Sequence, residues 1–181
     1  MERSLALVAL FAALIVALAF VPSLQLGFGV PISAQTLGIM LCGTVLGARK
    51  GTLAVLLFLL LVAVGLPVLS GGRGGIGVFM GPTIGYLVGF PVGAFVTGLI
   101  ARRFDRPLSF LPAVTGALVG GVVVVNILGI LGMMWRLDMS LTTATVSALA
   151  FVPGDLIKAV IAALVTNAIG EARPSLAALH R

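Results

Sequence analysis

Long apolar runs follow one another along almost the whole chain, and they constrain its fold more than any other feature. A helix needs about 20 largely apolar residues to cross the roughly 30 Å hydrocarbon core of a bilayer. Turn-forming or charged segments separate the runs, so each run is interpreted as one transmembrane helix. The six predicted spans are approximately residues 5–22, 33–48, 51–68, 81–101, 109–133 and 144–170.

Composition excludes a water-soluble globule. Of the 181 residues 60% are hydrophobic and only 9% are charged, which is too little polar surface to cover a domain in water. The spans leave no room for a second domain, so residues 1–181 are predicted to form one all-α integral membrane domain. The only cysteine, Cys42, lies in an apolar run and is interpreted as a packing residue, which leaves no internal disulfide or multi-cysteine metal site.

Basic residues divide unequally between alternate loops. The net charge of +6 does not indicate nucleic-acid binding, because the basic side chains are scattered between apolar runs. With the N-terminus inside, the outer loops hold only Arg73 and Arg136, and Lys158 lies within the last span. This bias predicts that both termini are cytoplasmic. The basic residues of the inner loops are Arg3, Arg49, Lys50, Arg102, Arg103, Arg106, Arg173 and Arg181.

Small residues recur at every fourth position in two of the predicted helices. Such residues let helix backbones approach closely within a membrane. In the first span we call them the alanine face, which either packs internally or binds a partner; it consists of Ala9, Ala13 and Ala17. In the fourth span we interpret them mainly as intramolecular packing positions; they are Gly81, Gly85, Gly89 and Gly93.

The last apolar run contains an acid and a base, Asp155 and Lys158. Each costs roughly 2.5–3.5 kcal/mol at the centre of a spanning helix on insertion scales, so both are expected to face the protein interior. Their i, i+3 spacing places them on one helix face, where they can pair. Two interpretations follow: a structural ion pair, or the polar floor of a ligand pocket. An enzyme is disfavoured, since no nucleophile or third catalytic group accompanies the pair.

A glycine-rich segment, residues 66–77, precedes the fourth span and carries Arg73 at its centre. Glycine permits close backbone approach to a ligand, so this outer loop suits a lid over a binding site. It lacks the Lys and Ser/Thr of a P-loop, and the chain has no motif for ATP hydrolysis. Tyr86, the only tyrosine, follows the loop and can stack on a ligand. Polar residues expected to bond between helices are Gln35, Thr36 and Asn126.

Five ordered segments together resemble the BioY family, the biotin-binding S components of energy-coupling factor (ECF) vitamin transporters. The segments are VPISAQTLG (30–38), LGARKG (46–51), GLPV with its glycine loop (65–77), GPTIGY (81–86) and PGDLIK (153–158). The resemblance implies a six-helix, ECF S-component-like, substrate-binding bundle in the cytoplasmic (inner) membrane of a prokaryote. It also implies an outward-facing pocket under the loop between helices 3 and 4. The implied partners are biotin, a transmembrane coupling (T) protein and two ATP-binding cassette subunits, which use the ATP; no cofactor is implied in this chain.

The same resemblance assigns expected roles to individual residues. Asp155 and Lys158 match the ligand-binding acid and base, and Tyr86 matches the aromatic residue at the start of helix 4. Some members have an arginine directly after this tyrosine, where this chain has Leu87. Arg73 is therefore the candidate partner of the biotin carboxylate. The alanine face looks like the surface by which S components contact their coupling protein.

Other functions remain open at this stage. The same scaffold can serve another vitamin, such as thiamine or riboflavin, and competition with excess biotin would discriminate between them. A secondary transporter working alone is also possible, although inverted repeats of short broken helices are not evident.

Overall fold

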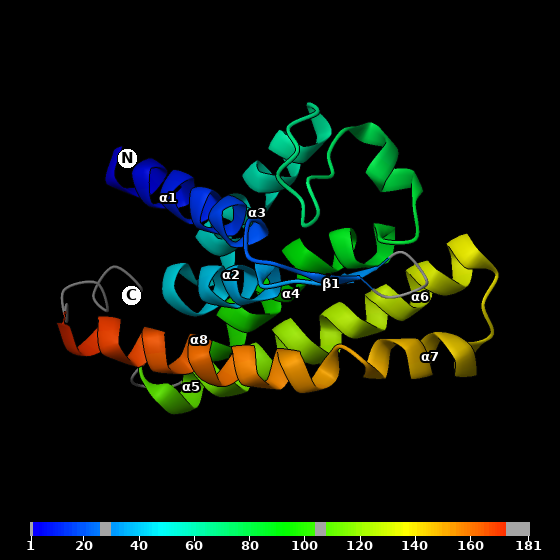
Figure 1. The fold of residues 1–181 in the computed structure, drawn as a ribbon. Helices are drawn as coiled ribbons and strands as arrows, with labels where there is room; N and C mark the ends of the chain where they lie inside the picture. Colours follow the sequence, from blue (N-terminus) through cyan, green and yellow to red (C-terminus); the bar gives the residue numbers. More distant parts are fainter. Residues whose placement is uncertain (1, 26–29, 104–107, 173–181) are drawn as a thin grey trace.

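The chain is almost entirely helical in the computed structural model, which describes residues 2–25, 30–103 and 108–172. Two short strands, β1 (Leu24–Gln25) and β2 (Pro31–Ile32), pair antiparallel between the first two helices. The helices, shown in Figure 1, are α1 (Glu2–Ala19), α2 (Gln35–Leu41), the π-helix η1 (Cys42–Leu46), α3 (Gly47–Ala63), the 3₁₀-helix η2 (Ile76–Met80), α4 (Ile84–Ala101), α5 (Phe110–Gly116), the π-helix η3 (Ala117–Val124), α6 (Val125–Leu137), α7 (Leu141–Leu149) and α8 (Val152–Ala172).

Within the part of the chain that the structure describes, four helical stretches are long and apolar enough to cross a membrane. They are Gln35–Ala63, Ile84–Ala101, Phe110–Leu137 and Val152–Ala172, and a shorter apolar helix covers Ser4–Ala19. These helices expose large aliphatic side chains, among them Leu10, Leu60 and Leu131 at 62%, 60% and 53% of their surface. Apolar surface on this scale is typical of contact with lipid. The protein is therefore an all-helical membrane protein.

The first of these stretches is not one straight helix, because the chain turns sharply at Gly47. Gly47 has φ 77° and ψ 179°, a conformation that strongly favours glycine. Beyond the turn, α3 packs back on η1 so closely that a Cβ on Gly51 would lie 2.3 Å from the carbonyl oxygen of Cys42. The connection predicted between the spans 33–48 and 51–68 is thus displaced toward the N-terminus, and Arg49 and Lys50 lie in the first turn of α3.

The run predicted as one span at 144–170 is divided between α7 and α8. The break falls at Ala150 and Phe151, and α8 begins at Val152 with Pro153 in its first turn. Proline suits this position, since its missing N–H would have no partner within the helix. Asp155 then lies in the first turn of α8, where the helix dipole favours a negative charge.

Glycines bring α4 against η3 and α6. A Cβ on Gly85 would lie 2.8 Å from the Cα of Gly132, and one on Gly93 would lie 2.8 Å from the carbonyl oxygen of Gly120. Gly81 instead precedes α4 and makes no such contact with another helix. The predicted intramolecular packing role is confirmed for the glycines within α4 but not for Gly81.

The helices form one bundle with distinct ends. In Figure 1 the beginning of α1 and the end of α8 lie at the same end, and the connection between α6 and α7 lies at the other. The segment between α3 and α4, residues 64–83, is called the lid loop and projects beside α4. At one end of the bundle α1 begins and α8 ends, and at the other end α6 is connected to α7.

Candidate functional site

A pocket lies where α2, α4 and α8 meet the lid loop and the connection between α1 and α2. Its empty volume is about 530 Å³, including space open to solvent at the mouth. The lining consists of Val30, Pro31, Ser33, Gln35, Thr36, Leu69, Ser70, Arg73, Thr83, Tyr86, Leu87, Phe90, Val125, Phe151, Asp155 and Lys158.

An acid, a base and a hydroxyl form a hydrogen-bonded ring in this pocket. Lys158 Nζ lies 2.9 Å from Asp155 Oδ1, and the two side chains are 15% and 5% exposed. Thr36 Oγ1, from α2, donates to Asp155 Oδ1 at 3.0 Å and accepts from Lys158 Nζ at 2.9 Å. Each charge therefore has a charge-assisted partner, which offsets part of the cost of its burial.

The second oxygen of Asp155 is only weakly engaged. Asn126 Nδ2, from α6, lies 3.5 Å from Asp155 Oδ2 and makes a shorter bond of 2.9 Å to the carbonyl oxygen of Val122. A donor–acceptor distance of 3.5 Å is long for an N–H···O bond. Asp155 Oδ2 can thus accept a hydrogen bond from a ligand without losing the bonds that hold the carboxylate in place.

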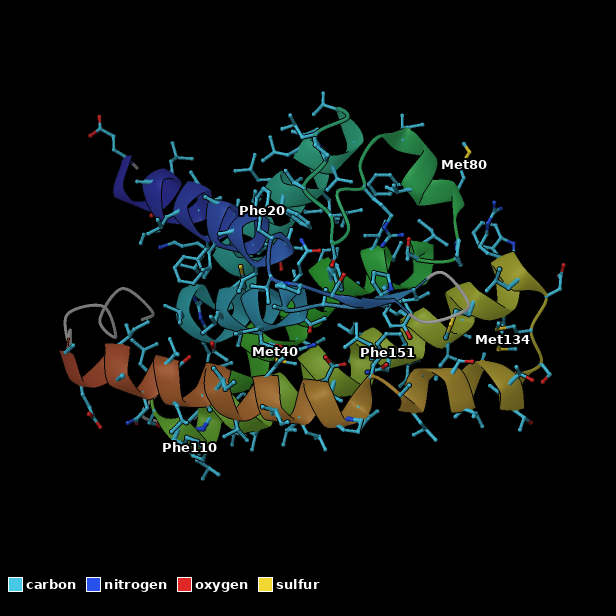
Figure 2. The ribbon with its side chains drawn as sticks, in the orientation of Figure 1. Phe20, Met40, Met80, Phe110, Met134 and Phe151 are labelled. Carbon is cyan, nitrogen blue, oxygen red and sulfur yellow. The ribbon has the colours of Figure 1, made fainter. Side chains whose placement is uncertain are left out.

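Aromatic side chains form much of the apolar wall. The rings of Tyr86 and Phe151 lie with their centroids 5.5 Å apart and their planes tilted by 55°. Phe151, labelled in Figure 2, directly precedes α8, and Phe90 lies one turn beyond Tyr86 in α4. Tilted pairs of this kind are favourable and rigid. They offer a flat apolar ligand a fixed surface beside the charged ring.

Two buried hydroxyl groups of the pocket lining have no hydrogen-bond partner among the described residues. They are Ser70 Oγ in the lid loop and Tyr86 OH in α4. Buried polar atoms are usually paired, so an unpaired one in a pocket indicates a place where a ligand or water binds. Tyr86, which the sequence predicts as a ligand contact, thus has a hydroxyl group in the pocket lining that a ligand can bind. The hydroxyl group of Ser70 is a second one of this kind.

The lid loop brings Arg73 into the pocket wall. The loop folds back on itself through a bridge between Leu69 and Arg73, and Arg73 Nε donates to the carbonyl oxygen of Ser70 at 3.2 Å. Burial lowers the pKa of the Arg73 guanidinium from its ordinary value. An anion beside it would offset that desolvation.

The charged groups of the lining sum to one positive charge. Arg73 and Lys158 each contribute +1 and Asp155 contributes −1. A ligand with one negative charge and a largely apolar body would complement such a pocket.

The structure thus brings together all four residues predicted to bind substrate, Asp155, Lys158, Arg73 and Tyr86, in one lining. The hydrogen bond between helices predicted for Thr36 is confirmed by its contacts with Asp155 and Lys158, but sequence reasoning did not place Thr36 in the site, and it missed Ser70 and Phe151. Thr36 and Ser70 lie within two of the quoted segments and Phe151 lies two residues before a third, which was the available signal.

The alanine face lies away from the pocket, on the outer surface of α1. Ala9, Ala13 and Ala17 are all exposed, whereas Ala12 and Ile15 on the other side of the helix are buried at 2% and 0% exposure. The contact of α1 with the rest of the chain therefore leaves these three residues uncovered.

Membrane-length helices around a pocket with a buried ion pair define a membrane-embedded binding protein for a small molecule. Residues 2–175 match the model of the BioY family. A biotin transporter BioY of Rhodobacter capsulatus is 52% identical over 97% of both chains. A probable biotin transporter BioY of Bacillus subtilis is 42% identical over 91% of this chain and 89% of its own.

Solved structures agree with this assignment. A crystal structure of the S-component for biotin from an ECF-type ABC transporter has a TM-score of 0.88 to this chain at 34% identity. The match covers 94% of this chain and 92% of the other. The chain belongs to the BioY family.

Proposed function

We propose that this protein captures biotin with high affinity and takes it up across the cytoplasmic membrane as the S component of an ECF-type ABC transporter. The observation that carries the proposal is the pocket itself. It combines a buried acid–base ring, an apolar aromatic wall and one net positive charge. Biotin has the matching parts: a polar ureido ring, an apolar bicyclic body and one carboxylate. The protein is not itself an enzyme.

The acid–base ring suits the ureido group. That group presents two N–H donors and one carbonyl acceptor. Asp155 Oδ2 accepts from a ureido N–H, while Lys158 orients the acid and donates to the ureido oxygen. Thr36 holds both side chains in place. An analogue without the N–H would leave a desolvated carboxylate unpaired, which gives the site its discrimination.

The carboxylate of biotin pairs with Arg73 in this proposal. Arg73 Nε is held by the carbonyl oxygen of Ser70, and its other guanidinium nitrogens have no partner among the described residues. The side chain at position 87, where some relatives have arginine, is a buried leucine that adds only apolar surface. Tyr86 OH and Ser70 Oγ supply further hydrogen bonds to the ligand.

In the membrane, the domain of residues 1–181 forms six spans with both termini cytoplasmic and the lid loop outside. The beginning of α1 and the end of α8, which lie at the same end of the bundle in Figure 1, and the basic residues of the predicted inner loops support this orientation. The alanine face contacts a transmembrane coupling protein, and two ATP-binding subunits supply the energy. The exposure of all three alanines supports that contact.

Calorimetric titration of the detergent-purified chain tests the ligand. We expect tight one-site binding of biotin and no heat with thiamine or riboflavin. Binding of either of these vitamins, with excess biotin unable to compete, would assign the pocket to that vitamin instead. A folded, monodisperse sample that gives no heat with biotin would overturn the proposal.

The role of Arg73 is tested with Arg73→Gln and two ligands, biotin and its uncharged amide. Because hydrogen bonds to charged groups contribute about 1.5–3 kcal/mol, we expect roughly ten- to a hundredfold weaker biotin binding. The amide should bind the variant and the parent protein almost equally. An equal loss for both ligands would show that Arg73 shapes the lid loop rather than binding the carboxylate.

A further inference from the structure

The amide side chain of Gln35 occupies a junction between α1, α2 and the lid loop. Gln35 is the first residue of α2 and is only 2% exposed. Its side chain also forms part of the pocket lining, next to Thr36 of the charged ring. A buried amide at such a junction needs partners for two N–H donors and one carbonyl oxygen.

The structure supplies a partner for each of these groups. Gln35 Oε1 accepts from the backbone N–H of Ser70 at 2.9 Å. Gln35 Nε2 donates to the backbone carbonyl of Val68 at 3.1 Å and to that of Ile15, in α1, at 3.3 Å. One side chain thus joins two backbone positions of the lid loop to the second half of α1.

Few other bonds hold the lid loop to the rest of the bundle. Apart from its bonds to Gln35, the lid loop makes hydrogen bonds within itself and to the adjoining helices α3 and α4. Among the described residues there is one exception. That exception is Arg136, which donates to the carbonyl oxygen of Met80 at the far end of the loop. Among the described residues, the hydrogen bonds that join residues 68–70 to another element come from Gln35, while Leu69 also packs into the hydrophobic core; Leu69 and Ser70 line the pocket.

We infer that Gln35 is a positioning residue that fastens the lid loop to α1 and keeps it closed over the ligand. This inference rests on the proposed function, in which biotin lies beneath the loop. Release of the ligand requires residues 68–70 to lift, which breaks the two bonds to the lid. Because the same amide also bonds α1, whose outer surface carries the alanine face, a partner that displaces α1 weakens the fastening.

The test compares Gln35→Met, which keeps the length but loses every bond, with Gln35→Glu, which keeps only the acceptor for Ser70. Dissociation of radiolabelled biotin should accelerate by at least about tenfold in Gln35→Met, with association changed far less. The Gln35→Glu variant should also release biotin faster than the parent protein. Amide hydrogen exchange of residues 66–75 should accelerate in both variants even without biotin.

The link to α1 has its own readout. In the parent protein, biotin should slow amide exchange in the second half of α1 as well as in the lid loop. In Gln35→Met the α1 effect should disappear. The matched control is Thr166→Val, because Thr166 is fully buried and bonds α8 to Thr44 far from the lid loop. Its biotin release and lid exchange should equal those of the parent.

Other results would overturn the inference. Parent-like release and lid exchange in Gln35→Met would do so, as would equal acceleration in Thr166→Val. If Gln35→Met does not fold, the same measurements on Gln35→Glu decide, with parent-like values counting against the fastening. Failure of the proposed function can be distinguished from failure of this inference. If the proposed function is wrong, the parent protein does not bind biotin, but amide hydrogen exchange of the lid loop without ligand still reports on the role of Gln35.

Discussion

The charged ring of the pocket shows how a membrane domain retains an acid and a base in its interior. Asp155 and Lys158 neutralise one another, and Thr36 bonds to both. Removing one member of a buried pair leaves the other charge without compensation, which is more damaging than replacing both. Substitutions at these positions must therefore be designed to keep the remaining partner satisfied.

Asp155→Asn keeps the shape of the side chain and one oxygen that accepts from Lys158, although it removes the counter-charge of that lysine, so some loss of stability accompanies the change. We expect biotin affinity to fall by more than about tenfold, since the variant loses the charged acceptor for the ureido N–H. Calorimetric titration measures the affinity, and thermal melting of the ligand-free protein checks the fold. Unchanged affinity in a well-folded variant would assign the ion pair a purely structural role.

The charged residues of the site could be predicted from the sequence, whereas the threonine and the serine that contribute hydroxyl groups could not. Asp155 and Lys158 stand out in sequence because charges inside a spanning helix are costly and rare. Thr36 does not, since a threonine within a helix bonds its own backbone as readily as a distant side chain. The unpaired hydroxyl of Ser70 depends on how the lid loop folds, which local sequence does not determine.

At the scale of elements, contacts between helix backbones hold the bundle together. α4 meets α6 at Gly85 and Gly132, where a Cβ on Gly132 would lie 2.4 Å from the Cα of Gly85. Backbone cannot move aside as a flexible side chain can. Small residues at such crossings allow the van der Waals contact that drives helix association in lipid.

Gly132→Ala should therefore destabilise the protein. Overpacking of this kind costs about 1–3 kcal/mol, so the melting temperature in detergent should fall measurably. Gly81→Ala is the matched control, since the nearest atom to its Cβ would be the Val78 carbonyl oxygen at 3.6 Å. Equal melting temperatures for the two variants would contradict the proposed crossing.

The sequence predicts the presence and the packing surface of these helices more accurately than the residues at which they begin and end. The spacing of glycines in α4 indicated its packing surface correctly, because helical periodicity is a local property. The structure places the turn at Gly47, earlier than the sequence predicts, because the prediction assigns the charged residues Arg49 and Lys50 to the loop. They fit instead in the first turn of α3, with Arg102 Nη2 bonded to the carbonyl oxygen of Leu46 beside the turn.

For the whole molecule, the two ends of the bundle differ in what they carry. Arg49, Lys50 and Arg103 lie near helix ends away from the lid loop, and Arg49 and Arg103 are exposed. The pocket and its lid loop occupy the other end. This polarity agrees with the proposed orientation, with the basic end in the cytoplasm.

Cysteine labelling in intact cells tests that orientation. In a Cys42→Ala background, Gly77→Cys in the lid loop should react with an impermeant maleimide. Arg103→Cys should react only after the cells are made permeable. Both positions are exposed, so access rather than burial decides the result. The reverse pattern would place the pocket on the cytoplasmic side.

The position of the only tryptophan gives this protein a built-in optical probe. Trp135 is 71% exposed near the end of α6, and the Arg136 guanidinium lies 5.4 Å from the centroid of its ring. The same guanidinium donates to the carbonyl oxygen of Met80 in the lid loop. Movement of the loop at Met80 would break this bond or shift the cation relative to the indole, and either would change the cation–π contact. We therefore expect the intrinsic fluorescence of Trp135 to report on the lid loop without any added label.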